Sequence, residues 1–247
     1  MFDTGYLREV QFLKDKPGWT EDYPFSLPVF RGMDSIDLHP RVTCIIGENG
    51  TGKSTLLEAI AVAWGFNPEG GTRNFNFATR ASHSELHQYL RLVKGIKKPR
   101  DGYFLRAESF YNVATYIEEL DDGAGGPGLM YSYGDKSLHE QSHGEAFMSL
   151  VMNRFGGHGL YILDEPEAAL SPLRQMALLS RMNELIKQDS QFIIATHSPI
   201  IMGYPDADIW QLSPEGFTKV DYEETEHYKI MRDFIVNREK IVKILTE

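Results

Sequence analysis

Apolar residues fall along the chain in two kinds of pattern, short continuous runs and longer stretches with helical spacing. Near the beginning, short apolar runs predict strands at residues 6–13, 25–30 and 42–46. A helix is predicted at residues 53–64, where apolar residues recur at positions 56, 57, 60 and 64. Residues 66–81 are rich in Gly, Asn and Thr, which predicts a loop.

The middle of the chain predicts a mainly helical region. Helices are expected at residues 84–93, near 113–120 and at 142–155, with one strand at 103–107. The segment DDGAGGPG at residues 121–128 predicts a flexible loop, because neither a helix nor a strand tolerates so much Gly and Pro.

The last third alternates more regularly between the two patterns. A strand at 160–163, a helix at 172–187 and a strand at 191–195 are followed by two strand-like runs at 209–212 and 217–220. Strands that alternate with helices predict an α/β fold with parallel pairs of strands.

Residues 225–245 predict one amphipathic helix, with apolar residues at positions 231, 234, 235, 241, 242 and 245. Such a stripe most often packs on the protein's own core, and we expect that packing here. A groove on a partner protein is the alternative.

Composition bounds the class of protein. The 247 residues, 42% of them hydrophobic, suffice for one sizeable core. The net charge of −10 indicates a solvated acidic surface and does not suggest a general DNA-binding protein, which neutralises phosphates. Residues 91–100 are the exception, with five basic residues in ten; we interpret them as the end of a helix and its loop.

The cellular compartment is suggested by three features. The single cysteine, Cys44, lies in an apolar run, so it is expected in the core and no intrachain disulfide can form. The first 30 residues contain no signal segment, and no apolar run approaches the roughly 20 residues that span a bilayer. We therefore expect a cytoplasmic protein that does not insert into a membrane by itself.

The segment GENGTGKS at residues 47–54 matches the phosphate-binding pattern G-x-x-x-x-G-K-[ST] between a predicted strand and a predicted helix. The glycines let backbone N–H groups and the helix N-terminus hold a phosphate. Lys53 would reach the β- and γ-phosphates and Ser54 would bind Mg²⁺. A glycine-rich turn without a ligand is the weaker alternative. The candidate nucleotide-binding residues are Gly47, Asn49, Gly50, Thr51, Gly52, Lys53, Ser54 and Thr55.

Two carboxylates, Asp164 and Glu165, directly follow the apolar run at 160–163. A strand beside the phosphate loop would bring Asp164 to the shell of Mg²⁺ and Glu165 to the γ-phosphate, where it would polarise the attacking water. The alternative is that both acids merely precede the next helix.

His197 follows the run at 191–195, at the edge of the sheet where open α/β folds bind ligands. There it could hydrogen-bond the γ-phosphate. A lone histidine is usually structural, but this one is the third strand-end residue of a set. Ser198 and Pro199 predict the N-cap and first position of a helix.

Taken in order, GENGTGKST, YILDEPEAAL and ATHSP resemble the Walker A, Walker B and histidine-loop motifs of the ATP-binding-cassette (ABC) ATPase family. THSP and SHGE are more similar to the DNA-repair and chromosome-maintenance branch than to transporter subunits. Nearly the whole chain resembles small stand-alone bacterial ATPases described as AAA family ATPases.

The resemblance implies an α/β P-loop NTPase fold with a mixed central sheet flanked by helices, an N-terminal antiparallel β portion and a helical lobe that carries the signature motif. It implies one domain over residues 1–247. The nucleotide-binding core would comprise about residues 1–65 and 159–247, and the lobe about residues 66–158.

The segment QSHGE at residues 141–145 stands where the family has its signature motif, LSGGQ or LSGGE. In the family this motif completes the ATP site of the facing protomer. The resemblance therefore implies a head-to-tail homodimer around two ATP molecules, with Ser142 and Gly144 at the partner's nucleotide and His143 in place of the first glycine. Independently, the spacing of Ser142 and Glu145 predicts a capping box.

Other positions depart from the family pattern. Ser171 stands where aspartate is common, and Glu108 or Ser109 stands where a glutamine is expected. Glu108 is therefore a candidate metal ligand, with Ser54 and Asp164. The family often stacks an aromatic ring on adenine; Tyr23 and Phe25 are the candidates, although we expect both to pack in the core.

The leading hypothesis is an Mg²⁺-dependent ATPase with Lys53, Glu165 and His197 as catalytic residues, whose dimer closes on ATP and opens after hydrolysis. It would act in DNA maintenance or phage defence, with a nuclease or other effector, or DNA, as partner. One alternative is the nucleotide-binding subunit of a membrane transporter. Another is a kinase or nucleotide switch, against which the acidic pair and the signature motif argue.

Overall fold

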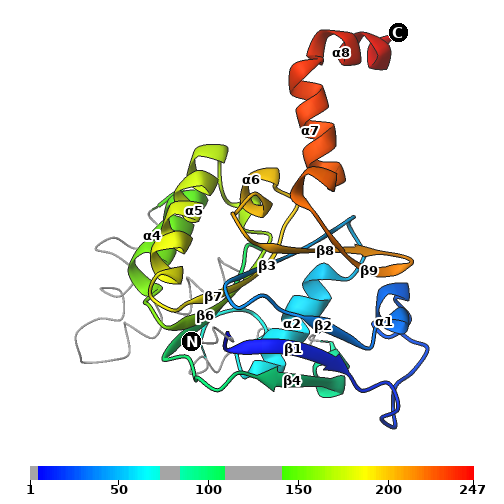
Figure 1. Cartoon of the computed structure of the whole chain (residues 1–247), viewed down its shortest axis with the longest axis vertical. Helices are drawn as coiled ribbons and strands as arrows, with labels where there is room; N and C mark the ends of the chain where they lie inside the picture. The colour runs from blue at the N-terminus through cyan, green and yellow to red at the C-terminus, as the bar shows by residue number, and fades with distance from the viewer. Residues whose placement is uncertain (1–4, 73–83, 109–140) are drawn as a thin grey trace.

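The computed structural model describes residues 5–72, 84–108 and 141–247, and its elements form two sheets (Figure 1). The helix expected near 113–120 and the loop expected at 121–128 lie outside these residues, as does most of the loop expected at 66–81.

The central sheet has six strands in the order β5-β6-β7-β3-β8-β9. All neighbouring pairs are parallel except β8 and β9, which form an antiparallel hairpin. The parallel strands therefore end at a common edge, to which the chain brings its predicted site residues. The strands are β3 (Val42–Gly47), β5 (Asp101–Arg106), β6 (Gly159–Asp164), β7 (Gln191–Ala195), β8 (Asp208–Ser213) and β9 (Gly216–Val220).

The second sheet is antiparallel, with the order β2-β1-β4. It consists of β1 (Leu7–Phe12), β2 (Ser35–Asp37) and β4 (Leu90–Lys94). The predicted α/β fold with a mixed central sheet and an N-terminal antiparallel portion is thus confirmed.

Two predicted elements are wrong. Residues 25–30 form no strand; they lead into the short helix α1 (Pro28–Gly32), whose first position is a proline with its fixed φ. Residues 84–93 are a single 3₁₀ turn, η1 (Glu85–Tyr89), followed by β4, because Leu90 and Leu92 lie along β1. The basic segment 91–100 is therefore β4 and its loop, not a helix end.

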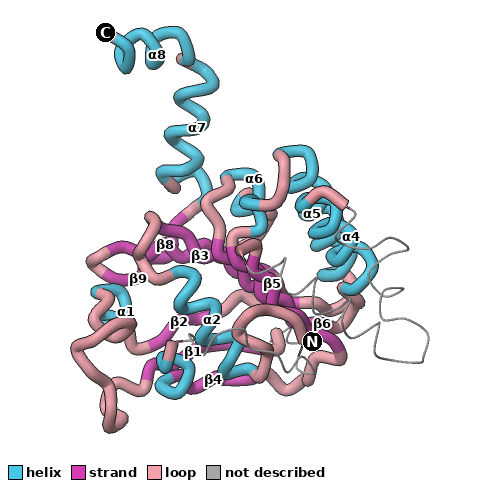
Figure 2. The backbone as a smooth tube through the Cα atoms, turned by 180° about the vertical axis from the view of Figure 1, so that it is seen from behind, coloured by secondary structure: helices cyan, strands magenta, loops and turns pink. Residues whose placement is uncertain are grey.

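The helices form two layers (Figure 2). Helix α2 (Lys53–Trp64) packs between the antiparallel sheet and one face of the central sheet, through Leu56, Leu57 and Ile60. The opposite face is covered by α4 (His143–Arg154), α5 (Pro172–Ile186) and α6 (Pro199–Met202). Cys44 belongs to this second core, where burial raises the pKa of its thiol to about 12, as expected of an inert residue.

Residues 66–158, expected to form a helical lobe, contribute β4 and β5 to the two sheets as well as α4. The described part of this stretch is therefore not helical throughout. Because residues 109–140 lie outside the described part, a separate lobe stays a prediction.

The C-terminal segment does not pack on the core. Instead of one helix it forms η5 (Tyr222–Glu224), α7 (Glu226–Val236) and α8 (Arg238–Thr246), and α7 and α8 extend away from the body (Figures 1 and 2). No residue of either helix is buried, and Ile235 and Leu245 are 68% and 75% exposed. The expectation of core packing was wrong, because periodicity shows that a helix has an apolar face but not what covers it. We call α7 and α8 the arm.

Asp101, at the start of β5, ties α4 to the central sheet. Its carboxylate accepts hydrogen bonds from Arg154 at 2.9 Å, the Gly156 backbone at 3.1 Å and the Tyr161 hydroxyl at 2.8 Å. Burial, the largest influence, raises the pKa of Asp101, but Arg154 and these hydrogen bonds together hold it below its ordinary value of 3.8. The ionised form therefore stabilises the fold.

We expect Asp101→Asn to lower the free energy of unfolding at pH 7 by about 1–3 kcal/mol. Because the pKa of Asp101 is lower in the folded protein than in the unfolded chain, its carboxylate stabilises the fold fully above the unfolded pKa. This stabilisation is lost as pH falls through the folded pKa, so the difference in stability between variant and wild type should shrink below about pH 4. Urea unfolding of both proteins between pH 7 and the acidic range measures this difference in stability. Asp34→Asn, at a side chain 97% exposed, is the control and should change little. A deficit independent of pH would contradict the assigned role.

Candidate active site

The phosphate loop connects β3 to α2, as the sequence predicts. Gly52, the N-cap of α2, has a φ of 101°, a left-handed conformation that favours glycine. At Gly47, with a φ of 150°, a Cβ would lie 2.7 Å from the carbonyl oxygen of Leu212. The chain can therefore turn here only with glycine at these two positions. Asn49 and Gly50, at the tip of the loop, are exposed.

Lys53 lies inside this loop. Its side chain is 3% exposed, and the ammonium donates to the carbonyl oxygens of Gly47 and Glu48, each at 2.9 Å. Burial lowers the pKa of Lys53, although the neighbouring carboxylates, Glu165 foremost, oppose that effect. The loop thus encloses a positive charge bound only to backbone carbonyls, which a phosphate oxygen can replace.

Ser54 and Asp164 lie beside each other across the sheet edge. The Ser54 hydroxyl donates to Asp164 Oδ1 at 3.0 Å. Burial raises the pKa of Asp164 to about 6, while Arg106 and the Ser54 hydroxyl oppose that rise. A hydroxyl and a carboxylate in contact are two of the hard oxygen ligands that Mg²⁺ takes, usually with water and nucleotide phosphates.

The described residues contain no cluster of three or more His, Cys, Asp or Glu that could hold a metal ion. The oxygens of Ser54 and Asp164 therefore fit a divalent ion that arrives with a phosphate ligand, rather than one caged by protein alone.

Glu165 and His197 meet at the ends of β6 and β7. His197 Nε2 lies 3.5 Å from Glu165 Oε1. Glu165 has left-handed backbone angles, with φ 49° and ψ 53°, and its N–H donates to Ala195 O at 2.9 Å. Burial lowers the pKa of His197, and the nearby Lys53 ammonium lowers it further. The structure thus brings Lys53, Ser54, Asp164, Glu165 and His197 together.

Glu167 also belongs to the site, although it was not predicted from the sequence. It lies in η4 (Pro166–Ala168), and its carboxylate accepts hydrogen bonds from the Thr196 hydroxyl at 2.8 Å and from the His197 backbone N–H. Burial raises the pKa of Glu167, which these hydrogen bonds oppose. Glu167 therefore fixes the backbone that carries His197. Its place two residues after Glu165 was the available signal.

Arg106, at the end of β5, was also missed. Its Nη1 lies 2.8 Å from Glu58 Oε2, and its Nε lies 3.4 Å from Asp164 Oδ2. Glu108 does not join Ser54 and Asp164; its carboxylate lies 3.8 Å from Arg106 and its side chain is 86% exposed. The cation beside Asp164 could have been anticipated, because β5 pairs with β6 so that Arg106 faces Asp164.

The signature segment starts α4 with the predicted capping box. Glu145 Oε2 accepts hydrogen bonds from the Ser142 backbone N–H at 3.0 Å and from its hydroxyl at 2.6 Å, and these bonds lower the pKa of Glu145. Ser142 and His143 are exposed. Gly144 is buried, and a Cβ there would lie 2.6 Å from the carbonyl oxygen of Ala169. Ser142 is therefore exposed at the N-terminus of α4, while Gly144 packs against the loop before α5.

The two aromatic candidates differ in environment. Phe25 is buried against Trp19 and Tyr89, as expected. Tyr23 is 66% exposed, so the packing expected for it was wrong; its hydroxyl lies 2.8 Å from Thr55 Oγ1. Tyr23 and Thr55 line a cavity of about 610 Å³ that also includes Ser54, a size that suits a small ligand.

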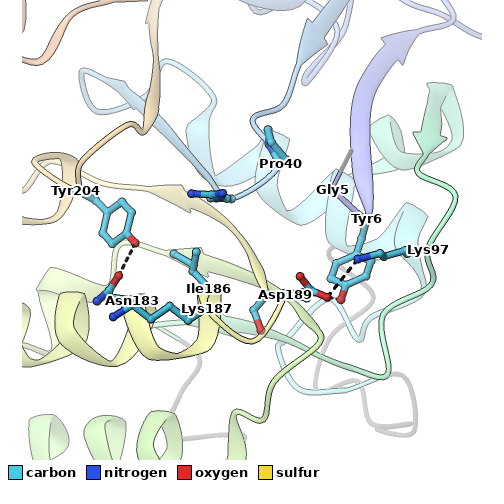
Figure 3. A pocket seen from close by; sticks show the side chains of 11 residues that line it. Gly5, Tyr6, Pro40, Lys97, Asn183, Ile186, Lys187, Asp189 and Tyr204 are labelled. Carbon is cyan, nitrogen blue, oxygen red and sulfur yellow. Dashed lines mark hydrogen bonds and ion pairs between the residues drawn. The ribbon is translucent and has the colours of Figure 1, made fainter. Parts of the chain in front are cut away.

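A second cavity, of about 330 Å³, lies at the opposite edge of the central sheet, where β3 and β7 begin (Figure 3). Its lining side chains bind one another. Lys97 lies 3.2 Å from Asp189, and the Tyr204 hydroxyl donates to Asn183 at 3.3 Å. None of the predicted site residues lines it.

Comparison with known proteins finds matches to two family descriptions and to curated proteins. Residues 29–124 match the family described as an AAA domain, and residues 139–203 match one described as an AAA domain, putative AbiEii toxin, Type IV TA system. An uncharacterized ABC transporter ATP-binding protein of Haemophilus influenzae is 25% identical over 179 residues, which cover 64% of this chain and 65% of that protein. These matches support an ABC-type ATPase family for the chain.

Another relative of the chain is the energy-coupling factor transporter ATP-binding protein EcfA1 of Fusobacterium nucleatum. It is 27% identical over 181 residues, which cover 69% of this chain and 68% of that protein. The chain thus spans about two thirds of the length of these relatives. Among solved structures, the SMC head domain from Thermotoga maritima superposes with a TM-score of 0.46 at 16% identity, covering 87% of this chain and 99% of that one.

Among the helices that the structure describes, none combines the length and the apolar character that a membrane span requires.

Proposed function

We propose that this ATPase hydrolyses ATP with Mg²⁺ as a head-to-tail dimer that encloses two nucleotides. The phosphate loop binds the phosphates through its N–H groups and Lys53, and Ser54 and Asp164 hold Mg²⁺. Glu165 accepts a proton from the attacking water, and His197 contacts the γ-phosphate. Mg²⁺, once bound, supplies charge neutralisation at the transferred phosphoryl group.

The observation that carries the proposal is the meeting of three strand ends. The residues at and after the ends of β3, β6 and β7 place a buried ammonium, an adjoining hydroxyl and carboxylate, and a carboxylate–imidazole pair at one edge of the sheet. Phosphoryl transfer needs these parts and little else, because its catalysis is mostly positioning and electrostatic stabilisation. Tyr23, exposed beside Thr55, is in position to stack on adenine.

The dimer is proposed from the position of Ser142. Its hydroxyl is exposed at a helix N-terminus, which favours anions. In the isolated chain the Ser142 hydroxyl donates to the Glu145 carboxylate. When the dimer closes, the hydroxyl must leave this carboxylate and donate to the γ-phosphate of the partner's ATP instead. Gly144 is in contact with the loop before α5, which lets that loop and the signature segment move as one unit.

We also propose how the chain divides into core and lobe and where in the cell the protein acts. We assign residues 1–65 and 159–247 to the nucleotide-binding core and residues 66–158 mainly to the signature lobe, while β4 and β5 of that stretch support the core. We place the protein in the cytoplasm, where ATP and reduced thiols such as that of Cys44 are both maintained.

Two variants test whether each ATP site is formed by residues of both protomers. Lys53→Ala disables a protomer's own phosphate loop. Ser142→Asp keeps a good N-cap but places a negative charge against the partner's γ-phosphate. Each variant alone should be inactive. An equimolar mixture should regain about a quarter of the wild-type rate, because random pairing gives half heterodimers with one intact site each.

Steady-state phosphate release at constant total protein measures this complementation. Ser171→Asp, which restores the residue common in the family, is the matched control and should leave the rate near wild type. A mixture no more active than the two variants added together would contradict the head-to-tail arrangement.

The proposed dimer has two candidate cellular roles, which differ in the partner that it drives. The first is DNA maintenance or phage defence with a nuclease or other effector, which the word toxin in the second matching family supports. The second is a transporter's nucleotide-binding subunit, which the names of the curated relatives favour. Stimulation of the ATPase rate by single- or double-stranded DNA would support the first. An unchanged rate, with co-purification of a membrane protein, would support the second.

A further inference from the structure

A second histidine, His227, adjoins the site. It lies in the first turn of α7, and its Nε2 is 3.2 Å from His197 Nδ1, with the two ring centroids 5.4 Å apart. His197 Nε2, on the other side of its ring, faces the Glu165 carboxylate at 3.5 Å. The three side chains therefore form a row from α7 to the end of β6.

The contacts in this row favour one position for each proton. Among the described residues His197 Nε2 has no hydrogen-bond partner, but it faces the Glu165 carboxylate, which only accepts hydrogen bonds and therefore favours a proton on that nitrogen. In a neutral imidazole, Nδ1 is then an acceptor, and its partner His227 must donate through Nε2–H. His227 Nδ1 is left as a lone-pair nitrogen, in agreement with its being buried without a hydrogen-bond partner.

The electrostatics agree with two neutral rings. Burial, the largest influence, lowers the pKa of His197 and that of His227, and the Lys53 ammonium lowers both further. Glu165 opposes this effect at His197, and Glu226 opposes it at His227. At neutral pH the row is therefore a chain of donors that ends at Nε2–H of His197.

We propose that His227 is a positioning residue that holds His197 in the tautomer with a proton on Nε2, aimed at Glu165 and the γ-phosphate. This inference rests on the proposed role of His197 in hydrolysis. A γ-phosphate oxygen, like a carboxylate, only accepts hydrogen bonds, so the other tautomer would present a lone pair to it. An outer hydrogen-bond partner that sets the tautomer of a functional histidine is a general device.

The position of His227 connects the nucleotide site to the arm. Thr225 caps α7 by accepting from the Tyr228 N–H at 3.3 Å, and the Tyr222 hydroxyl donates to Pro199 O at 2.9 Å, two residues beyond His197. The first turn of α7 is thus tied to the segment that carries His197. From Ile230 onward, α7 is exposed. Any tilt of α7 displaces His227, so the arm and the nucleotide site are mechanically linked.

The first test compares His227→Ala with His227→Gln. Glutamine has an N–H donor at similar reach, so it should preserve most of the activity, whereas alanine should lower kcat about tenfold with little change in KM. Arg232→Ala, on the exposed part of α7, is the control and should match wild type. Equal losses in the alanine and glutamine variants, or a loss in KM alone, would overturn the proposal.

The second test removes both histidines. If His227 acts through His197, then His227→Ala should lower the rate of wild type but not that of His197→Ala. A further tenfold loss in the double variant would overturn the proposal. A wild-type rate in His197→Ala would instead refute the proposed function of His197.

Imidazole ¹⁵N shifts of His197 test the inference without relying on activity. They should show one tautomer, protonated at Nε2, in the wild-type protein and in His227→Gln, and a mixture in His227→Ala. The same single tautomer in all three proteins would overturn the proposal even if the role of His197 in hydrolysis holds.

Discussion

Replacing Glu165 by glutamine is expected to lower the rate of ATP hydrolysis by about 10²- to 10⁴-fold, the usual contribution of a general base. Glutamine keeps the size of the side chain and an oxygen that can face His197, but it cannot accept a proton from water. Because Lys53, Ser54 and Asp164 are unchanged, the variant should still bind ATP. With hydrolysis blocked, the closed dimer should accumulate, since ATP favours whichever state it binds more tightly.

Gel filtration with ATP and Mg²⁺ and single-turnover kinetics measure these two effects. Glu239→Gln, on the exposed helix α8, removes the same charge away from the site and is the matched control. A Glu165→Gln protein that stays monomeric at saturating ATP and Mg²⁺ would contradict the sandwich dimer. One that hydrolyses ATP at the wild-type rate would contradict the role of Glu165.

Replacing Lys53 by alanine is expected to weaken ATP binding about 100-fold, because charge-assisted hydrogen bonds to phosphate contribute about 1.5–3 kcal/mol each. The loss has a second cause in the structure. The Lys53 ammonium also interacts electrostatically with Asp164, Glu165 and Glu167, so its removal leaves these carboxylates near the phosphates with less compensating positive charge. Hydrolysis should fall with binding.

Isothermal titration with a non-hydrolysable ATP analogue gives the affinity, and thermal unfolding shows whether the fold persists. Lys229→Ala, at a surface ion pair with Glu224, is the control. Together the variants separate binding from chemistry: Lys53→Ala should bind ATP much more weakly, and Glu165→Gln should bind ATP normally with little turnover. Unchanged affinity in Lys53→Ala would exclude the phosphate loop as the nucleotide site.

The central sheet and its site could be predicted because both depend on local signals. Each of β3, β6 and β7 is a buried, mainly apolar run, and each ends at or shortly before the functional residues that it carries. Parallel strands end at one edge, so residues far apart in the sequence meet there without any knowledge of contacts. The same reasoning failed at residues 25–30 and 84–93, where apolar residues serve tertiary packing with no clear period of their own.

The site residues that were not predicted from the sequence were missed for a different reason. Arg106, Glu167 and His227 act through partners on other elements: Arg106 through Glu58, 48 residues away, and the other two through His197, 30 residues away. The signals for the first two were indirect, namely the pairing of β5 with β6 and the place of Glu167 two residues after Glu165, and nothing in the sequence next to His227 marks its partner. The arm is a related case, because hydrophobic periodicity predicts an apolar face but not whether the protein covers it.

The left-handed backbone of Glu165 has a consequence for evolution. A residue with a Cβ costs roughly 1–2 kcal/mol in this conformation, and glycine would avoid most of that cost. A glycine here would give a more stable protein without a base beside the γ-phosphate. Selection for thermal robustness alone would therefore drive this position away from glutamate, so the acid persists only while turnover is under selection. In a lineage that had lost hydrolysis, this position would be among the first to drift.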